Sequence, residues 1–293
     1  MNDMEYIFHI LIMVNIYVII TVSTSFLVGF GGLISLGQAA FYGLGAYLTA
    51  FALMQLNLPM IPTIILIIIL AGGISFLIGK TSLHLVGDYF ILATLAFQLI
   101  VFTILYNWTS VTKGPYGIAG IPEPELFGMI QIDGIIPFLI LSTVLMLIVL
   151  GIFYRLMHSP FGRSLKGMRD DSTALQSLGK NPKKLKIQAF ILAGSFTALS
   201  GFIYASYVSY IDPTSFNLDE AIFIISAVLI GGTGNIKGPA AGAVVVVILP
   251  EILRFLGMPE SIAANMRMII YGLILIVLMH FRTEGLAGKY KLK

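Results

Sequence analysis

Residues 155–188 read RLMHSPFGRSLKGMRDDSTALQSLGKNPKKLKIQ and interrupt an otherwise apolar chain. This stretch carries eight of the 17 lysines and arginines in the protein, and long apolar runs lie on both sides of it. Short basic loops between membrane-spanning helices stay in the cytoplasm. The stretch therefore predicts an orientation for the whole chain, with this loop on the cytoplasmic side of a membrane.

The same loop has the pattern of a short surface helix. Ser159 and Pro160 are a typical cap and first-turn proline, and Gly179 followed by Asn181 and Pro182 is a typical stop. Between these signals, apolar residues at spacings of three, seven and three form one stripe: Leu165, Met168, Leu175 and Leu178. A surface helix with such a stripe needs either the lipid interface or another protein to cover it.

The composition outside the loop is that of a membrane protein. The chain is 58% hydrophobic and only 11% charged, whereas soluble domains carry about a quarter charged residues. Its 293 residues are too few for several spans and a large soluble domain, so we expect one transmembrane domain over residues 1–293, with a cytoplasmic loop at 158–183. Cysteine is absent, which excludes disulfides and thiolate metal sites. The N-terminus lacks a basic region and a cleavage site and is interpreted as a first span.

A helix needs about 20 apolar residues to cross the hydrocarbon core. The predicted fold class is therefore all-α, a polytopic transmembrane helical bundle of about nine spans. The predicted spans are residues 6–28, 33–55, 60–79, 86–107, 134–157, 184–208, 217–232, 240–256 and 262–281. With the basic loop in the cytoplasm, the 107–133 and 209–220 loops lie outside and the C-terminal tail lies inside.

Residues 29–45, GFGGLISLGQAAFYGLG, are unusually rich in glycine. Small residues let helices approach closely in lipid; alternatively, the stretch is a broken or re-entrant helix that lines a cavity, and a re-entrant one moves the N-terminus inside. GGLISLGQAA at 31–40 resembles GGTGNIKGPAA at 231–241, and each opens an apolar span. Both glycine pairs fall on the inner side of the predicted topology. The similarity is either a parallel internal repeat or chance likeness between Gly/Ala-rich helices.

Polar residues within predicted spans are expensive in lipid and are functional candidates by default. Asn15, Gln38, Asp88 and Gln98 are of this kind, although Asp88 lies near the inner boundary and can also reach the aqueous phase.

No catalytic or metal-binding constellation stands out. Gly79-Lys80-Thr81 resembles the end of a phosphate-binding loop, but Ile74 occupies the position where that motif requires glycine. The chain is therefore not expected to bind ATP by that motif or to be an enzyme.

Five stretches together carry a specific resemblance that covers most of the chain. They are GLISLGQAAFYGLGAYLTA (32–50), LVGDYFILATLAF (85–97), NWTSVTKGPYGIAGIP (107–122), SPFGRSLKGMRDDSTALQSLGKNPKKLKIQAF (159–190) and VLIGGTGNIKGPAAGAVVV (228–246). With these stretches the chain closely resembles the LivM-type permease subunits of branched-chain amino acid ABC importers.

The resemblance implies a multi-pass protein of a bacterial or archaeal cytoplasmic membrane that forms half of a translocation path for leucine, isoleucine and valine. It implies a homologous LivH-type permease partner, two ATP-binding cassette subunits that bind ATP and magnesium, and an extracytoplasmic substrate-binding protein. Membrane lipid surrounds such a chain, and no nucleic acid is involved. Two alternatives stay open: the same architecture importing urea or short amides, and an ATP-independent secondary transporter.

The resemblance also assigns the basic loop as the segment that couples to the ATPase subunits, docking as a helix in a groove. Ala174 and Gly179 match the small residue and the glycine of the importer signature, while Ser172 or Thr173 stands where the signature has Glu. The expected coupling residues are Arg163, Leu165, Met168, Ala174, Leu175, Leu178 and Gly179.

The expected path-lining residues are Gln38, Tyr42, Asp88, Tyr89, Thr94 and Gln98. One departure bears on the substrate, because family members often carry Glu shortly after the aromatic that Phe97 matches, and here Gln98 and Leu99 follow. The partner of a substrate amine is therefore left open, and urea remains a candidate.

Overall fold

The computed structural model describes residues 3–82, 85, 87–126, 130–255, 266, 269–270, 272–273 and 285–288. Within these ranges, five helices are long and apolar enough to cross a membrane: Met4–Phe30, Met60–Ser82, Asp88–Asn107, Ile135–His158 and Pro182–Val208. They confirm a helical membrane bundle, whereas the count of about nine spans stays a prediction. The predicted span 262–281 lies largely outside the described residues.

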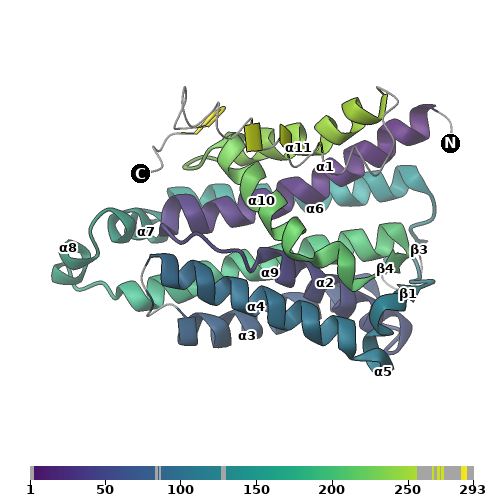
Figure 1. The fold of residues 1–293 in the computed structure, drawn as a ribbon, viewed down its shortest axis with the longest axis horizontal. Helices are drawn as coiled ribbons and strands as arrows, with labels where there is room; N and C mark the ends of the chain where they lie inside the picture. Colours follow the sequence, from purple (N-terminus) through teal and green to yellow (C-terminus); the bar gives the residue numbers. More distant parts are fainter. Residues whose placement is uncertain are drawn as a thin grey trace.

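The long helices form one elongated bundle (Figure 1). They are α1 (Asp3–Ser25, continued by the π-helical η1, Phe26–Phe30), α2 (Gln38–Met54), α3 (Met60–Ser82), α4 (Asp88–Asn107), α6 (Ile135–His158), α9 (Pro182–Val208), α10 (Leu218–Gly231) and α11 (Lys237–Phe255). The helix α9 lies centrally and packs most extensively on α2 and α3, while α1 packs on α6, α9 and α11.

Short elements gather at the two ends of the bundle. They are α5 (Thr109–Thr112), η2 (Gly114–Tyr116), β1 (Ile118–Ala119), β2 (Glu125–Leu126), β3 (Ile130–Gln131), α7 (Pro160–Asp170), α8 (Ser172–Ser177), β4 (Tyr210–Ile211) and η3 (Pro213–Phe216). In Figure 1, α7 and α8 lie at one end of the long axis and the β strands at the other. We call these ends the α7/α8 end and the β1/β4 end.

The two loops predicted to lie on the same side of the membrane pair with each other. Strands β1 and β4 are antiparallel, with Ile118 opposite Ile211 and Ala119 opposite Tyr210. The N-terminus belongs to this end as well, because His9 Nδ1 lies 2.8 Å from the hydroxyl oxygen of Tyr207, in the last turn of α9. The start of α1 is therefore at the end opposite the basic loop. This agrees with the prediction in which residues 29–45 are not re-entrant.

The glycine-rich stretch 29–45 contains both of the features that were considered as alternatives, a broken helix and a close helix–helix contact. Residues 32–37 form no helix, so α2 starts only at Gln38 and the predicted span 33–55 is broken. Farther along, a Cβ placed on Gly45 would lie 2.0 Å from the carbonyl oxygen of Ala198, and one on Gly201 would lie 2.3 Å from that of Tyr42. The backbones of α2 and α9 thus touch, which only glycine permits here.

The two turns that contain the similar glycine pairs lie side by side. A Cβ on Gly29 would lie 2.8 Å from Cβ of Thr233 and 2.9 Å from the nitrogen of Gly234. Gly32 and Gly232 both have positive φ, 65° and 85°, and each ends a descending helix before an ascending one. These equivalent turns support a parallel repeat of α1–α2 and α10–α11 over chance likeness.

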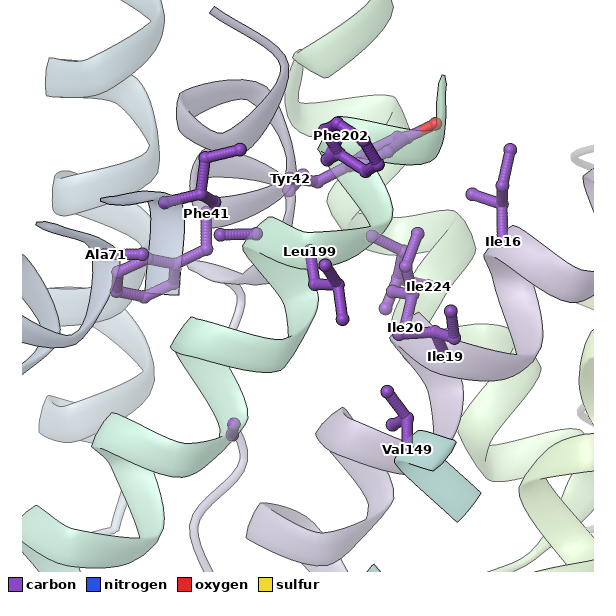
Figure 2. Close-up of a cluster of buried hydrophobic side chains, with 14 of the residues drawn as sticks. Ile16, Ile19, Ile20, Phe41, Tyr42, Ala71, Val149, Leu199, Phe202 and Ile224 are labelled. Carbon is purple, nitrogen blue, oxygen red and sulfur yellow. The ribbon is translucent and has the colours of Figure 1, made fainter. Parts of the chain in front are cut away.

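The core lies where these helices cross. Figure 2 shows buried side chains of α1, α2, α3, α6 and α10 together with Leu199 and Phe202 of α9, which are almost fully buried. The labelled residues are Ile16, Ile19, Ile20, Phe41, Tyr42, Ala71, Val149, Leu199, Phe202 and Ile224. In lipid, close packing of this kind replaces the hydrophobic effect as the main force between helices, so the core fixes the positions of the elements described next.

Candidate functional site

Two helices begin inside the bundle, halfway between its ends. The backbone N–H of Leu36, just before α2, donates to Oγ1 of Thr94 over 3.1 Å. The carbonyl oxygen of Phe216, just before α10, accepts from Nε2 of Gln98 over 2.7 Å, and Gln98 lies at the middle of α4. The irregular segment 32–37 and the segment 212–217, which contains η3, therefore enter the bundle from opposite ends. Helix starts carry partial positive charge, and interrupted helices in this arrangement are typical of transporter substrate sites.

Polar side chains gather at this level. Oε1 of Gln38 accepts a 2.9 Å hydrogen bond from Thr197 Oγ1, and Gln38, Thr94 and Gln98 are all buried. Nε2 of Gln38 and Oε1 of Gln98 find no hydrogen-bond partner among the described residues. Leaving such a group buried and unpaired costs about 1–3 kcal/mol, so stability alone does not explain these two atoms.

Aromatic rings close the space between the two helix starts. Tyr42 lies edge-on to Phe216 with 5.0 Å between ring centroids, and Tyr204 lies 5.5 Å from Tyr42 and 5.8 Å from Phe216. A Cβ on Gly43 would lie 2.9 Å from Phe216, so glycine makes room for the ring. Tyr42 and Phe216 are 2% and 1% exposed, and the bundle is closed at this depth.

One acidic residue of this centre was missed by the sequence interpretation. Residues 209–220 were expected to form an outer loop that overlaps the predicted span 217–232. After β4 the chain turns back into the bundle, so the loop assignment is wrong for residues 213–216, while α10 begins at Leu218, close to the start of the predicted span. Glu220 Oε1 accepts a 2.9 Å hydrogen bond from the Tyr17 hydroxyl in the middle of α1. The signal in the sequence was Asn217 followed by Asp219 and Glu220, a helix start; the side chain of Asn217 accepts from the N–H of Glu220 over 3.1 Å.

The expected path residues fall into two groups. Gln38, Tyr42, Thr94 and Gln98 meet at the centre of the bundle, as described above. Asp88 and Tyr89 lie in the first turn of α4 with exposed side chains, 70% for Tyr89. These two residues are at the α7/α8 end of α4 and do not join the central group.

The basic loop folds into two helices where one was expected. Ser159 caps α7, accepting from the N–H of Gly162 over 3.2 Å, as predicted. Asp171 then caps a second helix, α8, accepting from the N–H groups of Thr173 and Ala174 over 2.8 and 3.0 Å. Gly179 ends the segment with a φ of 75°. The intervening cap at Asp171 breaks the predicted single helix.

The apolar stripe of the loop faces mostly inward. Leu165, Met168 and Leu175 are 0%, 3% and 8% exposed and belong to the chain's own core. The expectation that they need an outside partner to cover them is therefore wrong, because this protein's own bundle covers them. Leu178 is 78% exposed and is the stripe residue left at the surface.

The surface that projects from the α7/α8 end is the tip formed by α8 and the turn after it (Figure 1). Ala174, Leu178 and Gly179 are exposed there, and Arg163 is exposed on α7, where its Nη1 donates to the carbonyl oxygen of His158 over 3.2 Å. On its other side α7 contacts η1, since Lys166 Nζ lies 4.7 Å from the ring centroid of Phe30. The tip is thus free to meet a partner while α7 is fixed to the bundle.

Comparison with known proteins gives a consistent result. The family model described as "Branched-chain amino acid transport system / permease component" matches residues 6–279. The high-affinity branched-chain amino acid transport system permease protein LivM of Salmonella typhimurium is 31% identical, over 94% of this chain and 68% of its own length. LivM of Escherichia coli K12 is 29% identical over 92% and 67%. The ribose import permease protein RbsC of Haemophilus influenzae is 28% identical over 94% and 84%. No solved structure matches.

Proposed function

Because the chain belongs to the family of branched-chain amino acid transport permease components, we propose that it is the membrane-spanning subunit of an ATP-driven importer. It forms half of the translocation path for leucine, isoleucine and valine and hydrolyses no ATP itself. Residues 1–293 act as one permease domain, with residues 158–183 as its coupling loop. The observation that carries the proposal is the meeting of two interrupted helices at the centre of the bundle.

The α7/α8 end is the cytoplasmic end. Eight of the 17 basic residues lie in the loop 155–188, and the positive-inside rule places such a loop in the cytoplasm. The β1/β4 end, with the N-terminus, then faces outward, where an extracytoplasmic binding protein delivers substrate. The C-terminal tail is cytoplasmic, and the chain lies in the cytoplasmic membrane of a bacterium or archaeon.

The chemistry of the centre fits an amino-acid zwitterion. The starts of α2 and α10, with the amide Nε2 of Gln38, suit a carboxylate. Glu220, with Oε1 of Gln98, suits an ammonium group. The rings of Tyr42 and Phe216 suit an aliphatic side chain. These groups are buried in the closed form, so substrate reaches them when α2 and α10 move apart. Asp88 and Tyr89 then line the cytoplasmic end of the path, with Thr94 between.

Glu220 can take the role of the acid that family members often carry near the position of Gln98. A relative's acid after the aromatic position is replaced here by an amide, but α10 brings a carboxylate into the same region from elsewhere in the chain. Urea and short amides are neutral, and the two glutamine side chains alone would suffice for them. A partly buried carboxylate is expensive to maintain in a membrane, which favours a cationic group as its ligand.

The tip of α8 is the docking element for an ATP-binding cassette subunit, with Leu178 as its apolar anchor and Ala174 and Gly179 allowing close approach. Arg163 contacts the rim of that groove, whereas Leu165, Met168 and Leu175 hold the tip rigidly on the bundle. The complete importer holds two such subunits, which bind ATP and magnesium, and a homologous LivH-type permease.

Crosslinking tests the coupling assignment, and the absence of cysteine makes it direct. Ser177, exposed on α8, is changed to Cys, and Ser110, exposed at the opposite end, serves as the matched control. We expect Ser177→Cys to capture the ATP-binding subunit from the native membrane and Ser110→Cys not to. Capture by both variants or by neither, with intact complex, would contradict the docking assignment.

Substrate-stimulated ATP hydrolysis by the reconstituted importer tests the substrate. We expect stimulation with leucine, isoleucine or valine and none with urea or ribose, and we expect Glu220→Gln to abolish the leucine response. A response to urea that survives Glu220→Gln would favour the urea alternative. Uptake by the chain alone in liposomes, driven by an ion gradient, would favour a secondary transporter.

A further inference from the structure

A group of exposed aromatic side chains lies at the β1/β4 end, where α4 ends and the chain turns through α5 toward β1 (Figure 1). Trp108, Tyr116 and Tyr210 are 54%, 88% and 40% exposed. We call residues 108–116 the aromatic segment. From position 106 to position 122 the sequence has a single charged residue, Lys113. The surface is therefore apolar over most of its area, with polar groups at the tips of its rings.

The aromatic segment continues the face of α4 that meets lipid. Leu92, Ile100, Ile104 and Trp108 are all exposed, and their spacings of eight, four and four place them on one side of the helix. Because α4 is long and apolar enough to cross a membrane, this side faces acyl chains. Trp108 therefore lies at the end of a lipid-facing stripe.

The length of α4 places Trp108 at the edge of the hydrocarbon core. Asp88, in the exposed first turn of α4, and Trp108 lie 20 positions apart, which at the helical rise is about 30 Å. A bilayer's hydrocarbon core is also about 30 Å thick. An exposed carboxylate belongs outside this core, so Asp88 lies at one boundary and Trp108 at the other. Tryptophan and tyrosine are enriched at that depth, because their rings are apolar and their N–H and O–H groups reach water.

The turn that follows Trp108 is held by one threonine. The hydroxyl of Thr112 donates to the carbonyl oxygens of Leu105 and Trp108 over 2.6 and 2.8 Å and accepts from the N–H of Gly114 over 3.2 Å. Lys113 takes a left-handed φ of 60°, which changes the direction of the chain. The aromatic side chains are therefore presented from a fixed backbone.

The aromatic segment is also connected to the chain that closes the central site. The hydroxyl of Tyr210 donates to the carbonyl oxygen of Tyr116 over 3.3 Å, and a Cβ on Gly117 would lie 2.4 Å from the carbonyl oxygen of Ile211. Strands β1 and β4 pair directly after these contacts. Next along the chain from β4 is η3, whose Phe216 closes the space between the two helix starts. A contact that holds the aromatic segment in place therefore also holds the outer end of this closure.

We propose that the aromatic segment is an interfacial anchor, which lies in the headgroup layer of the leaflet at the β1/β4 end and contacts it through the rings of Trp108 and Tyr116. Its partner is lipid because the segment extends an acyl-facing stripe, lies at the depth of the headgroups and has a single charge. By holding β1 and β4, the interface keeps Phe216 in its closed position. This second role rests on the proposed function, whereas the contact with lipid does not.

Trp108 is the only tryptophan in the sequence, so the fluorescence of the unmodified full chain reports this position directly. In phosphatidylcholine vesicles we expect its emission at a shorter wavelength than that of tryptophan in water. Phosphatidylcholine brominated near the headgroup end of its chains should quench it more than lipid brominated at the chain ends. Emission at the wavelength of tryptophan in water, with quenching by acrylamide and none by brominated lipid, would overturn the proposal and leave this surface to a protein partner.

Two relocated tryptophans calibrate the depth, each in a Trp108→Phe background. Ile100→Trp lies on the same stripe, about 12 Å deeper, and should be quenched most by bromine at the chain ends. Ser177→Trp, on the exposed tip of α8, should be quenched by acrylamide and not by brominated lipid. If Trp108 itself were quenched most by bromine at the chain ends, as in the Ile100→Trp variant, it would lie within the core, which contradicts an interfacial anchor.

Hydrogen exchange in vesicles tests the link to the closure. In Trp108→Ser/Tyr116→Ser, the backbone N–H groups of residues 117–121 and 209–216 should exchange faster than in the wild type. Tyr154→Ser is the matched control, since Tyr154 is an aromatic residue of α6, 57% exposed, near the α7/α8 end, and it should leave exchange in these residues unchanged. Unchanged exchange at 209–216 in the double variant, or equal acceleration in the control, would overturn the role in closure. Neither readout depends on transport, so failure of the anchor and failure of the proposed function are distinguishable.

Discussion

The guanidinium of Arg169, in α7, donates a 2.5 Å hydrogen bond to the carbonyl oxygen of Gly29, 140 residues earlier in the π-helical end of α1. Gly32 lies against the same side chain, since a Cβ there would lie 2.6 Å from Cγ of Arg169. Gly29 in turn touches Thr233 in the turn between α10 and α11. One arginine therefore connects the coupling loop to both glycine turns, and through them to the two helices that begin at the central site.

Arg169→Gln should lower the free energy of unfolding by about 2 kcal/mol, the usual contribution of a hydrogen bond from a charged group. Thermal unfolding of the detergent-solubilised chain measures this. Arg163→Gln is the matched control, because Arg163 is exposed and its guanidinium bonds to the end of the neighbouring helix α6; we expect a change below about 0.5 kcal/mol. In the assembled importer, Arg169→Gln should also lower the amount of substrate moved per ATP hydrolysed. Equal effects of the two variants would contradict a specific role for Arg169.

Gly201→Ala should separate α2 from α9. The new Cβ would lie 2.3 Å from the carbonyl oxygen of Tyr42 and 2.5 Å from the nitrogen of Ala46, and backbone cannot give way as a side chain does. We expect a loss of at least about 2 kcal/mol in stability. The control is Gly73→Ala in α3, where no atom lies within 4 Å; it should gain up to about 1 kcal/mol from better helix propensity. Equal melting temperatures for the two variants would be inconsistent with backbone contact between α2 and α9.

Gln38→Met should separate function from stability. The change leaves the buried hydroxyl of Thr197 without its acceptor, which costs about 1–3 kcal/mol, but it also removes the unpaired Nε2, whose burial costs a similar amount. We therefore expect a nearly unchanged melting temperature and a loss of leucine-stimulated ATP hydrolysis of tenfold or more, about 1.4 kcal/mol. Thr49→Val, which removes a buried hydroxyl that bonds within its own helix, should leave the leucine response intact. A large loss of stability with a normal leucine response would assign Gln38 a purely structural role.

The pH dependence of stability at the β1/β4 end should depend on Glu123. Partial burial, and then the hydrogen bond and charge of Asp133, raise the pKa of Glu123 above its ordinary value. A raised carboxyl pKa stabilises the fold below the pKa of the unfolded chain, and this stabilisation is lost as the pH rises through the folded value. Glu123→Gln should therefore be more stable relative to the wild type at pH 7 than at pH 4, by less than about 1 kcal/mol because solvent screens the pair.

Thermal unfolding at several pH values measures the effect of Glu123→Gln. Asp133→Asn serves as the reciprocal variant and should flatten the pH profile in part, because it removes the charge of Asp133 while the partial burial of Glu123 remains. An unchanged profile in both variants would mean that the two carboxyl groups do not interact in solution.

The charged residues and the helix caps in the sequence predicted which loops share an end of the bundle and where the loop segment begins and ends. The basic loop lies at one end of the bundle and the two acidic loops at the other, because lysine and arginine placement determines orientation independently of packing. Ser159 and Gly179 also begin and end the loop segment where expected, because caps depend on local geometry. These properties need no knowledge of which helices touch.

The wrong predictions concern residues whose location depends on which other helices they contact. The periodicity of Leu165, Met168 and Leu175 identified an apolar face but not what covers it, and here the chain's own helices do. Residues 213–216 lie just before the predicted span 217–232, and the two acids at the start of that span, Asp219 and Glu220, favoured water for this region. Only the contacts of Phe216 with Gln98 and of Glu220 with Tyr17 bring them inside. A helix that crosses only half of the membrane lacks the run of about 20 apolar residues by which a span is recognised in a sequence.

The contact between Gly29 and Thr233 has a consequence for how such chains evolve. The two positions share one small volume, so a side chain added at position 29 can be accommodated only if position 233 loses atoms. Among homologous sequences we therefore expect residue sizes at these positions to be inversely correlated, although the two lie in different halves of the repeat. Gly29→Ala should accordingly be harmful alone and partly rescued by Thr233→Gly, because the Thr233 side chain is then gone while the backbone nitrogen of Gly234 remains 2.9 Å from the new Cβ.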